Sequence, residues 1–443
     1  MHKGTFMDKY SQSDTVFFSQ RFFPYFVTQF FGAFNDNIYK NTLLIFVAFA
    51  SANQLPISST LFINLAAGIF ILPFFLFSAT AGVIADKYEK SKLIRWIKFA
   101  EIIIMIAGAI SFLYQSYLAL LILLFLMGTQ SAFFGPVKYA LLPQHLKPAQ
   151  LLKGNAWVET GTFLAILFGT IGAGIIVATP NAYWLTAVSV VFFAVLGFIA
   201  SLFIPKALPS PNHYQFSWKP IFHTQQTLNI AKQNRTIHLS IIAISWFWFL
   251  GACYLTQFPN FSKTYIQGDS TSVSFLLALF SVGIAIGSLL CAKLSHQKIN
   301  LKLVGLGGVG ISIFSVLLGL FSILIQTTST NDMISITNLL SSANYLPIFF
   351  SLFFLGVCGG TFIVPLYTLM QTLASTETRA QVIAANNIYN ALFMVGSAII
   401  SIVCLSLLSM AIHQFFIFLG ILNLLVIFGL YRYKPQTMTP ESH

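Results

Sequence analysis

Unbroken apolar runs of about 20 residues or more recur along the 443-residue chain. A helical run of this length matches the hydrocarbon thickness of a bilayer, whereas a strand of a membrane barrel alternates over about ten positions. Only 8% of the residues are charged, against about 25% in an ordinary soluble domain, so the surface of a water-soluble globule cannot be built from them. The sequence therefore predicts an all-α integral membrane protein.

Hydropathy places twelve transmembrane helices in two sets of six. The first set covers 22–50, 57–83, 93–115, 117–140, 156–179 and 182–204, and the second covers 237–262, 271–292, 301–326, 346–371, 381–408 and 411–432. The stretch between the sets is polar and contains four prolines. We therefore predict an N-terminal bundle over 1–204, a cytoplasmic linker over 205–236 and a C-terminal bundle over 237–443.

The distribution of basic residues predicts the orientation. With both termini in the cytoplasm, cytoplasmic loops and adjoining span ends hold all but three of the 23 Lys and Arg residues. Lys263 falls outside, and Lys40 and Lys98 lie within spans. Topogenic loops thus account for the net charge of +12, and no nucleic-acid partner is expected. The first twenty residues lack a cleavable signal pattern, so we expect the first span to be retained.

An internal repeat supports two related halves. The segment from Ala149 to Asn155 aligns with the segment from Ala380 to Asn386, and just upstream Pro136 faces Pro365. Two parallel six-helix repeats with a site between them at mid-depth are typical of a transporter.

Charged residues within apolar spans mark the first candidate site, because a charge at the centre of a spanning helix costs roughly 2.5–3.5 kcal/mol. The first span contains Asn35, Asp36 and Asn37, followed by Lys40. Asp36 and Lys40 are four residues apart, so they share a helix face and can form an ion pair. Either the pair neutralises itself and fixes helix packing, or it has a role in substrate binding or in coupling.

Other polar residues extend this site within the first half. Lys98 and Glu101 can pair within the third span, or Lys98 can extend to the nearby cytoplasmic surface. Glu159 opens the fifth span, where it can cap the helix or serve function. Further candidates are Lys138 and Tyr139 at the end of the fourth span, Asn155, and, in the second half, Asn386.

The loop between the second and third spans carries the most specific motif. It contains Gly82, Asp86, Lys87 and Lys90. Gly82 permits close helix contact, and Asp86 can pair with a cation and cap a helix of the other half. The simpler interpretation is a basic loop that only sets topology.

This loop resembles the signature of the major facilitator superfamily: a Gly, an Asp four residues later, then basic residues. The resemblance implies the superfamily's fold of two pseudo-symmetric six-helix bundles. It also implies that Gly82, Asp86, Lys87 and Lys90 latch the halves together in the outward-open state.

A narrower resemblance, to bacterial lysophospholipid transporters, rests on Phe30–Asn37, Gln130–Tyr139 and Gly154–Glu159. It implies inward movement of lysophosphatidylethanolamine-like lipids across the bacterial inner membrane, for re-acylation by an acyltransferase. By this likeness Asp36 and Lys138 are the leading candidates for headgroup recognition.

The residues themselves suit such a headgroup. Lys40 or Lys138 could bind a phosphate, and Asp36 or Glu159 an ammonium. The alternative is an exporter of a drug, siderophore or other amphipathic metabolite by proton antiport, with Asp36 or Glu159 carrying the proton.

Enzymatic and cofactor functions are not expected. The chain lacks a GxxxxGK[ST] phosphate loop, a nucleophile–base constellation and metal-ligand spacing among its cysteines and histidines. We therefore predict no catalytic residue, no metal and no cofactor, with membrane lipids and an amphipathic small molecule as partners.

Overall fold

The computed structural model describes residues 16–49, 55, 57–207, 220–268, 270–295, 298–325 and 336–432. Four basic residues used in the orientation argument, Lys3, Lys9, Lys219 and Lys434, lie outside this part. The helices of the first half are α1 (Phe23–Phe49), α2 (Ser59–Lys87), α3 (Lys90–Leu113), α4 (Tyr117–His145), α5 (Pro148–Val177) and α6 (Ala182–Leu202). Then follow α7 (Pro220–Gln233), α8 (Arg235–Phe261), η2 (Ser262–Ile266), α9 (Ser270–Leu294), α10 (Leu301–Leu324), α11 (Ile336–Ser341), η3 (Ala343–Tyr345), α12 (Leu346–Leu373), α13 (Arg379–Ile402), η4 (Val403–Leu407) and α14 (Ile412–Arg432).

Eleven helices in the described part of the chain are long and apolar enough to cross a membrane, and this confirms the all-α membrane architecture. Helix α1 is not among them, although its 27 residues reach about 40 Å. Gln29, Asp36 and Lys40 lower its hydropathy. Because α1 packs against α5 and α6, its polar residues face protein or the space between the bundles, and we count it as the twelfth spanning helix.

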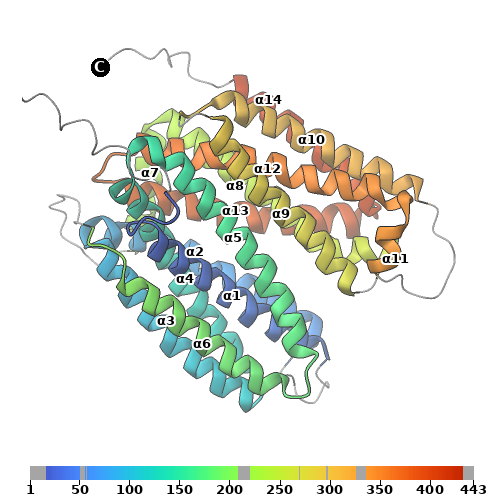
Figure 1. The fold of residues 1–443 in the computed structure, drawn as a ribbon, viewed down its shortest axis with the longest axis horizontal. Coiled ribbons are helices and arrows are strands. Elements are labelled where there is room, and N and C mark those ends of the chain that lie inside the picture. The colour runs from blue at the N-terminus through green and yellow to red at the C-terminus, as the bar shows by residue number, and fades with distance from the viewer. Residues whose placement is uncertain are drawn as a thin grey trace, which may run out of the picture.

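The long helices form two groups (Figure 1). Within the first group α1 packs on α5 and α6, α2 on α4, and α3 on α4 and α6. Within the second group α8 packs on α13, α9 on α12, and α10 on α12 and α14. The groups meet mainly through α2 against α13 and α5 against α9. In Figure 1 they lie closest near α7 and diverge toward the end that carries α11. We call the α7 end the linker side.

The structure differs from the sequence prediction most clearly at three places. Helix α2 continues to Lys87, so Gly82, Asp86 and Lys87 lie in this helix and not in a loop. Helix α5 begins at Pro148, eight residues earlier than expected, because proline suits the first helical turn and the side chain of Gln150 accepts a hydrogen bond from the Lys147 N–H. The predicted linker also contains α7, which packs against both α2 and α13 and so touches both groups.

Candidate functional site

A cavity of about 270 Å³ lies between the two groups of helices. Asp36, close to the midpoint of α1, lines it. The first group contributes side chains from α1 to α5, and the second group contributes side chains from α8, α12 and α13. Its polar lining includes Gln29, Asp36, Asn37, Lys40, Lys98, Gln130, Ser131, Lys138, Tyr139, Tyr367, Asn387 and Asn390. Its apolar lining includes Phe70, Phe74, Phe134, Ile166, Trp248 and Met394.

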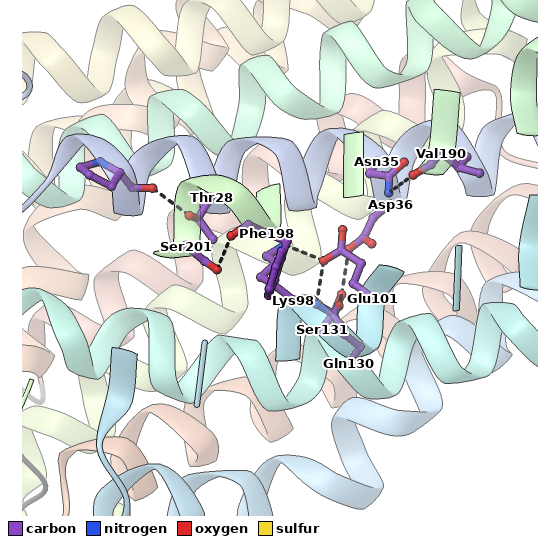
Figure 2. A network of polar contacts seen from close by, with 11 residues as sticks. Thr28, Asn35, Asp36, Lys98, Glu101, Gln130, Ser131, Val190, Phe198 and Ser201 are labelled. Atoms are coloured by element: carbon purple, nitrogen blue, oxygen red, sulfur yellow. Dashed lines mark hydrogen bonds and ion pairs between the residues drawn. The ribbon is translucent and has the colours of Figure 1, made fainter. Parts of the chain in front are cut away.

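Asp36 is held from helix α4. Ser131 Oγ donates a hydrogen bond of 2.8 Å to Asp36 Oδ2, and Figure 2 shows the two side chains pointing toward each other. The other carboxylate oxygen, Oδ1, has no hydrogen-bond partner among the described residues. One oxygen therefore orients the side chain, and the other is left to bind a donor.

Lys40 does not form the expected ion pair with Asp36. No salt bridge within 4 Å joins these two side chains, both of which lie in the described part of the chain. Instead the Lys40 Nζ lies 5.5 Å from the centre of the Phe70 ring. The spacing of four residues places both side chains on one face of α1, but the Asp36 carboxylate turns toward Ser131 on α4.

Lys98 does not extend to the membrane surface; it is fully buried. Its Nζ lies 2.6 Å from Glu101 Oε2, and Gln130 Nε2 donates to the same oxygen at 2.9 Å. Figure 2 shows this pair beside Asp36 and Ser131. Gly32 makes room for the ammonium group, since a Cβ at that position would lie 2.3 Å from Lys98 Nζ. Of the two arrangements open from the sequence, the structure has the ion pair, and it places Lys98 in the cavity wall.

Lys138 and Tyr139 form the part of the cavity nearest the linker side. Lys138 Nζ donates to Gln29 Oε1 at 3.1 Å and lies 4.8 Å from the centre of the Tyr139 ring. Tyr139 stacks on Tyr367 of α12 with ring centres 4.7 Å apart. Its hydroxyl donates to Glu159 Oε1 at 2.8 Å. These aromatic rings connect the two groups of helices on the linker side of the cavity.

Four of the predicted site residues lie outside the cavity lining. Asn35 Nδ2 donates to the carbonyl of Val190 on α6, as Figure 2 shows. Asn155 exchanges hydrogen bonds with Gln371 of α12, at 2.7 and 3.2 Å, and therefore bridges the two groups. Glu159 is buried three turns inside α5 and does not cap it. Asn386 is also buried, while the neighbouring Asn387 reaches the cavity.

Asp86 lies at the interface on the linker side. Its carboxylate accepts backbone hydrogen bonds from Ala380 at 2.9 Å and Gln381 at 3.1 Å, in the first turn of α13. A Cβ on Gly82 would lie 2.7 Å from the Ala384 Cβ, so glycine is needed for this close approach of α2 and α13. Lys87 Nζ lies 5.5 Å from the centre of the Tyr88 ring. Lys90, the first residue of α3, is buried. Asp86 thus caps a helix of the other group.

Sequence reasoning noted Asn386, Asn387 and Asn390 as the polar residues of the second half, but it missed the aromatic cavity residues Trp248 and Tyr367. Trp248 donates from Nε1 to the Tyr367 hydroxyl at 3.2 Å, but in sequence it stands in an apolar run like any other aromatic residue. Of the three asparagines, only Asn386, which the internal repeat aligns with Asn155, was predicted as a site residue. Consecutive residues of a helix point about 100° apart, so a repeat without a helix orientation cannot decide which of them reaches the cavity.

Three ammonium groups, from Lys40, Lys98 and Lys138, and one carboxylate, from Asp36, line this mostly apolar space. Such a site suits an amphipathic ligand whose polar end carries negative charge or both signs.

The sequence profile described as Major Facilitator Superfamily matches residues 25–392. A protein named lysophospholipid transporter LplT from Serratia proteamaculans is 26% identical over 389 residues, which cover 85% of this chain and 86% of that protein. A protein of the same name from Escherichia coli O1:K1 is 25% identical, with coverage of 82% and 83%.

Solved structures agree on the fold. The human organic anion transporter MFSD10 superposes with a TM-score of 0.73 at 13% identity, over 93% of this chain and 99% of that one. A bacterial homologue of the iron transporter ferroportin, in an outward-facing state, gives a TM-score of 0.63 at 14% identity, with coverage of 92% and 99%.

Proposed function

The chain belongs to the major facilitator superfamily of membrane transporters, and we propose that it moves lysophospholipid across the bacterial inner membrane by alternating access. The relatives named lysophospholipid transporter cover most of the chain and support this cargo. The observation that carries the proposal is the central cavity, in which opposite charges lie beside an apolar wall.

The headgroup is bound by charge. A lysophosphatidylethanolamine carries a phosphate and an ammonium group, so its site needs a cation and a carboxylate shielded from bulk water. The unpartnered Oδ1 of Asp36 accepts from the ammonium group. Lys138 binds the phosphate, and Lys40 is a further ammonium group in the cavity lining.

The acyl chain lies against the apolar wall. Phe70 and Phe74 of α2, Ile166 of α5 and Met394 of α13 line the cavity together with the polar residues. Burial of each CH₂ group contributes about 0.8 kcal/mol, so a single chain adds substantial affinity without any polar contact.

The two bundles, 1–204 and 237–443, rock about this site while the linker 205–236 keeps them together. The cavity is closed toward the linker side by the Tyr139–Tyr367 stack, the Asn155–Gln371 pair and the contact of Asp86 with α13. With the linker and both termini in the cytoplasm, this arrangement faces outward. Lysophospholipid then enters from the outer leaflet and is released inward to an acyltransferase.

Uptake of labelled lysophosphatidylethanolamine into proteoliposomes tests the site. Asp36→Asn and Lys138→Ala should each lower uptake roughly 10- to 100-fold, because each removes a charged hydrogen-bonding group worth about 1.5–3 kcal/mol. Glu377→Gln and Lys263→Ala are matched controls, since both side chains are exposed and outside the cavity.

A soluble siderophore serves as the competing cargo in the same assay. Normal uptake by both cavity variants would refute the assigned site. Faster transport of the siderophore than of the lysolipid, driven by an imposed pH gradient, would refute the proposed cargo.

A further inference from the structure

A second, larger cleft lies inside the C-terminal half, away from the central cavity. It has a volume of about 750 Å³ and lies between α8, α10, α12 and α14 at their linker-side ends. None of the residues that line it also lines the central cavity. Phe362 and Leu366 of α12, both buried, form its floor. The proposed transport mechanism makes no use of this cleft.

The mouth of the cleft opens on a surface that faces lipid. All four helices are long and apolar enough to span the membrane. Leu306 of α10 is 68% exposed and Phe428 of α14 is 55% exposed, and both line the opening. In a bilayer the molecules that reach such a surface are acyl chains. The cleft is about five times as large as the roughly 150 Å³ cavity that holds a benzene molecule, so it has room for a long chain.

The rim of the cleft on the linker side is basic. Lys302, in the first turn of α10, lines the cleft and is exposed. Arg432, the last residue of α14, lies 4.8 Å from the ring of Phe428 in the cleft wall. Among the described residues of the C-terminal half, Glu377 is the one acidic side chain, and it belongs to the connection between α12 and α13. The rim therefore carries positive charge where a lipid headgroup would lie.

We propose that this cleft binds a membrane phospholipid with an anionic headgroup, whose acyl chain lies against Phe362 and Leu366 and whose phosphate contacts Lys302 and Arg432. Basic pockets between membrane helices bind anionic headgroups for this electrostatic reason. The bound lipid is a resident of the C-terminal half and is not cargo.

Gly305 allows the cleft to be filled without disturbing the helices. It lines the cleft, and a Cβ added there would meet no atom within 4 Å. Gly305→Leu therefore places four carbon atoms in the space that the acyl chain would occupy. Gly68→Leu is the matched control, because Gly68 of α2 also has open space around its Cβ and lines neither cavity.

Native mass spectrometry of the purified full-length protein tests the site, with dioleoyl phosphatidylglycerol and dioleoyl phosphatidylcholine as competing lipids. We expect the wild type and Gly68→Leu to retain one phosphatidylglycerol in preference to phosphatidylcholine. Gly305→Leu should lose this lipid. The double variant Lys302→Ala/Arg432→Ala should bind phosphatidylglycerol roughly 30-fold more weakly and lose the preference.

Equal lipid retention by the wild type and Gly305→Leu would overturn the proposal. Light scattering tests whether a second copy of the chain occupies the cleft instead. If the wild type is a dimer and Gly305→Leu is a monomer, the proposal is also overturned. The lysolipid uptake assay separates this site from transport. If Asp36→Asn loses uptake but still binds phosphatidylglycerol, the substitution has disturbed only the central cavity, and the cleft is a separate site.

Discussion

Replacing Asp86 by asparagine is expected to weaken the contact between the two bundles on the linker side. The carboxylate of Asp86 accepts from the backbone N–H groups of Ala380 and Gln381 and, at 3.4 Å, from Gln381 Nε2. Asparagine keeps one acceptor oxygen but presents an NH₂ group where the second oxygen was. That group faces another donor, and the negative charge at the positive end of the α13 helix dipole is lost.

The size of the effect follows from these contacts. A hydrogen bond to a charged group contributes about 1.5–3 kcal/mol, and a charge at a helix terminus contributes up to about 2 kcal/mol, with overlap between the two. We take about 2 kcal/mol for the substitution, which corresponds to a roughly 30-fold shift between the closed and open states of the linker side. The shift requires that the contact exist in one state only.

Spin labels at Leu202 and Leu373 can measure this shift by double electron–electron resonance. These exposed residues end α6 and α12 on the linker side, one in each bundle. The four native cysteines, Cys253, Cys291, Cys358 and Cys404, are first replaced by alanine. The parent protein should give one short distance, and Asp86→Asn should add a population at a longer distance.

Glu89→Gln is the matched control, because it removes the same charge three residues away, at the N-cap of α3. The Glu89 carboxylate accepts from the backbone of Lys92 and Ala207, within the N-terminal half and the start of the linker, and does not reach α13. It should leave the distance distribution unchanged. An unchanged distribution in Asp86→Asn would refute the idea that this contact holds the linker side closed, as would an equal opening in both variants.

Two further predictions concern stability. Lys98→Met should destabilise the protein by about 3–5 kcal/mol in thermal unfolding, because it leaves the Glu101 carboxylate buried and unpaired. The double variant Lys98→Met/Glu101→Leu should recover most of that loss. Equal melting temperatures for the wild type and Lys98→Met would contradict this prediction. Burial on its own would raise the pKa of Glu89, but hydrogen bonds from Ala207, Ser91 and Lys92 lower it below the ordinary 4.5. The stabilisation by Glu89 is therefore present above that ordinary pKa and lost as the pH falls through the lower, folded-state pKa. The wild type should melt higher than Glu89→Gln at neutral pH, and the difference should vanish in strong acid; a difference that persists there would argue against this linkage.

Much of the site could be found from sequence because charge in an apolar span is costly and therefore conspicuous. Asp36, Asn37, Lys40, Lys138 and Tyr139 were identified in this way, and all line the cavity. Asn155 and Glu159 were identified by the same reasoning but contact Gln371 and Tyr139 instead. Buried polarity shows that a residue faces protein or water, but it does not distinguish a ligand site from a contact between helices.

The sequence alone determined the membrane class and the order of the spanning helices in two sets, and it singled out Asp86 as able to cap a helix of the other half. These properties depend on the length of apolar runs and on short motifs, which are local along the chain. The tertiary structure decided that Asp36 bonds to Ser131 and not to Lys40, that Lys98 enters the cavity wall, and that Asn387 reaches the cavity where Asn386 does not. These outcomes depend on the rotation of each helix about its axis and on which neighbour a side chain meets. Both are set by packing between segments far apart in sequence.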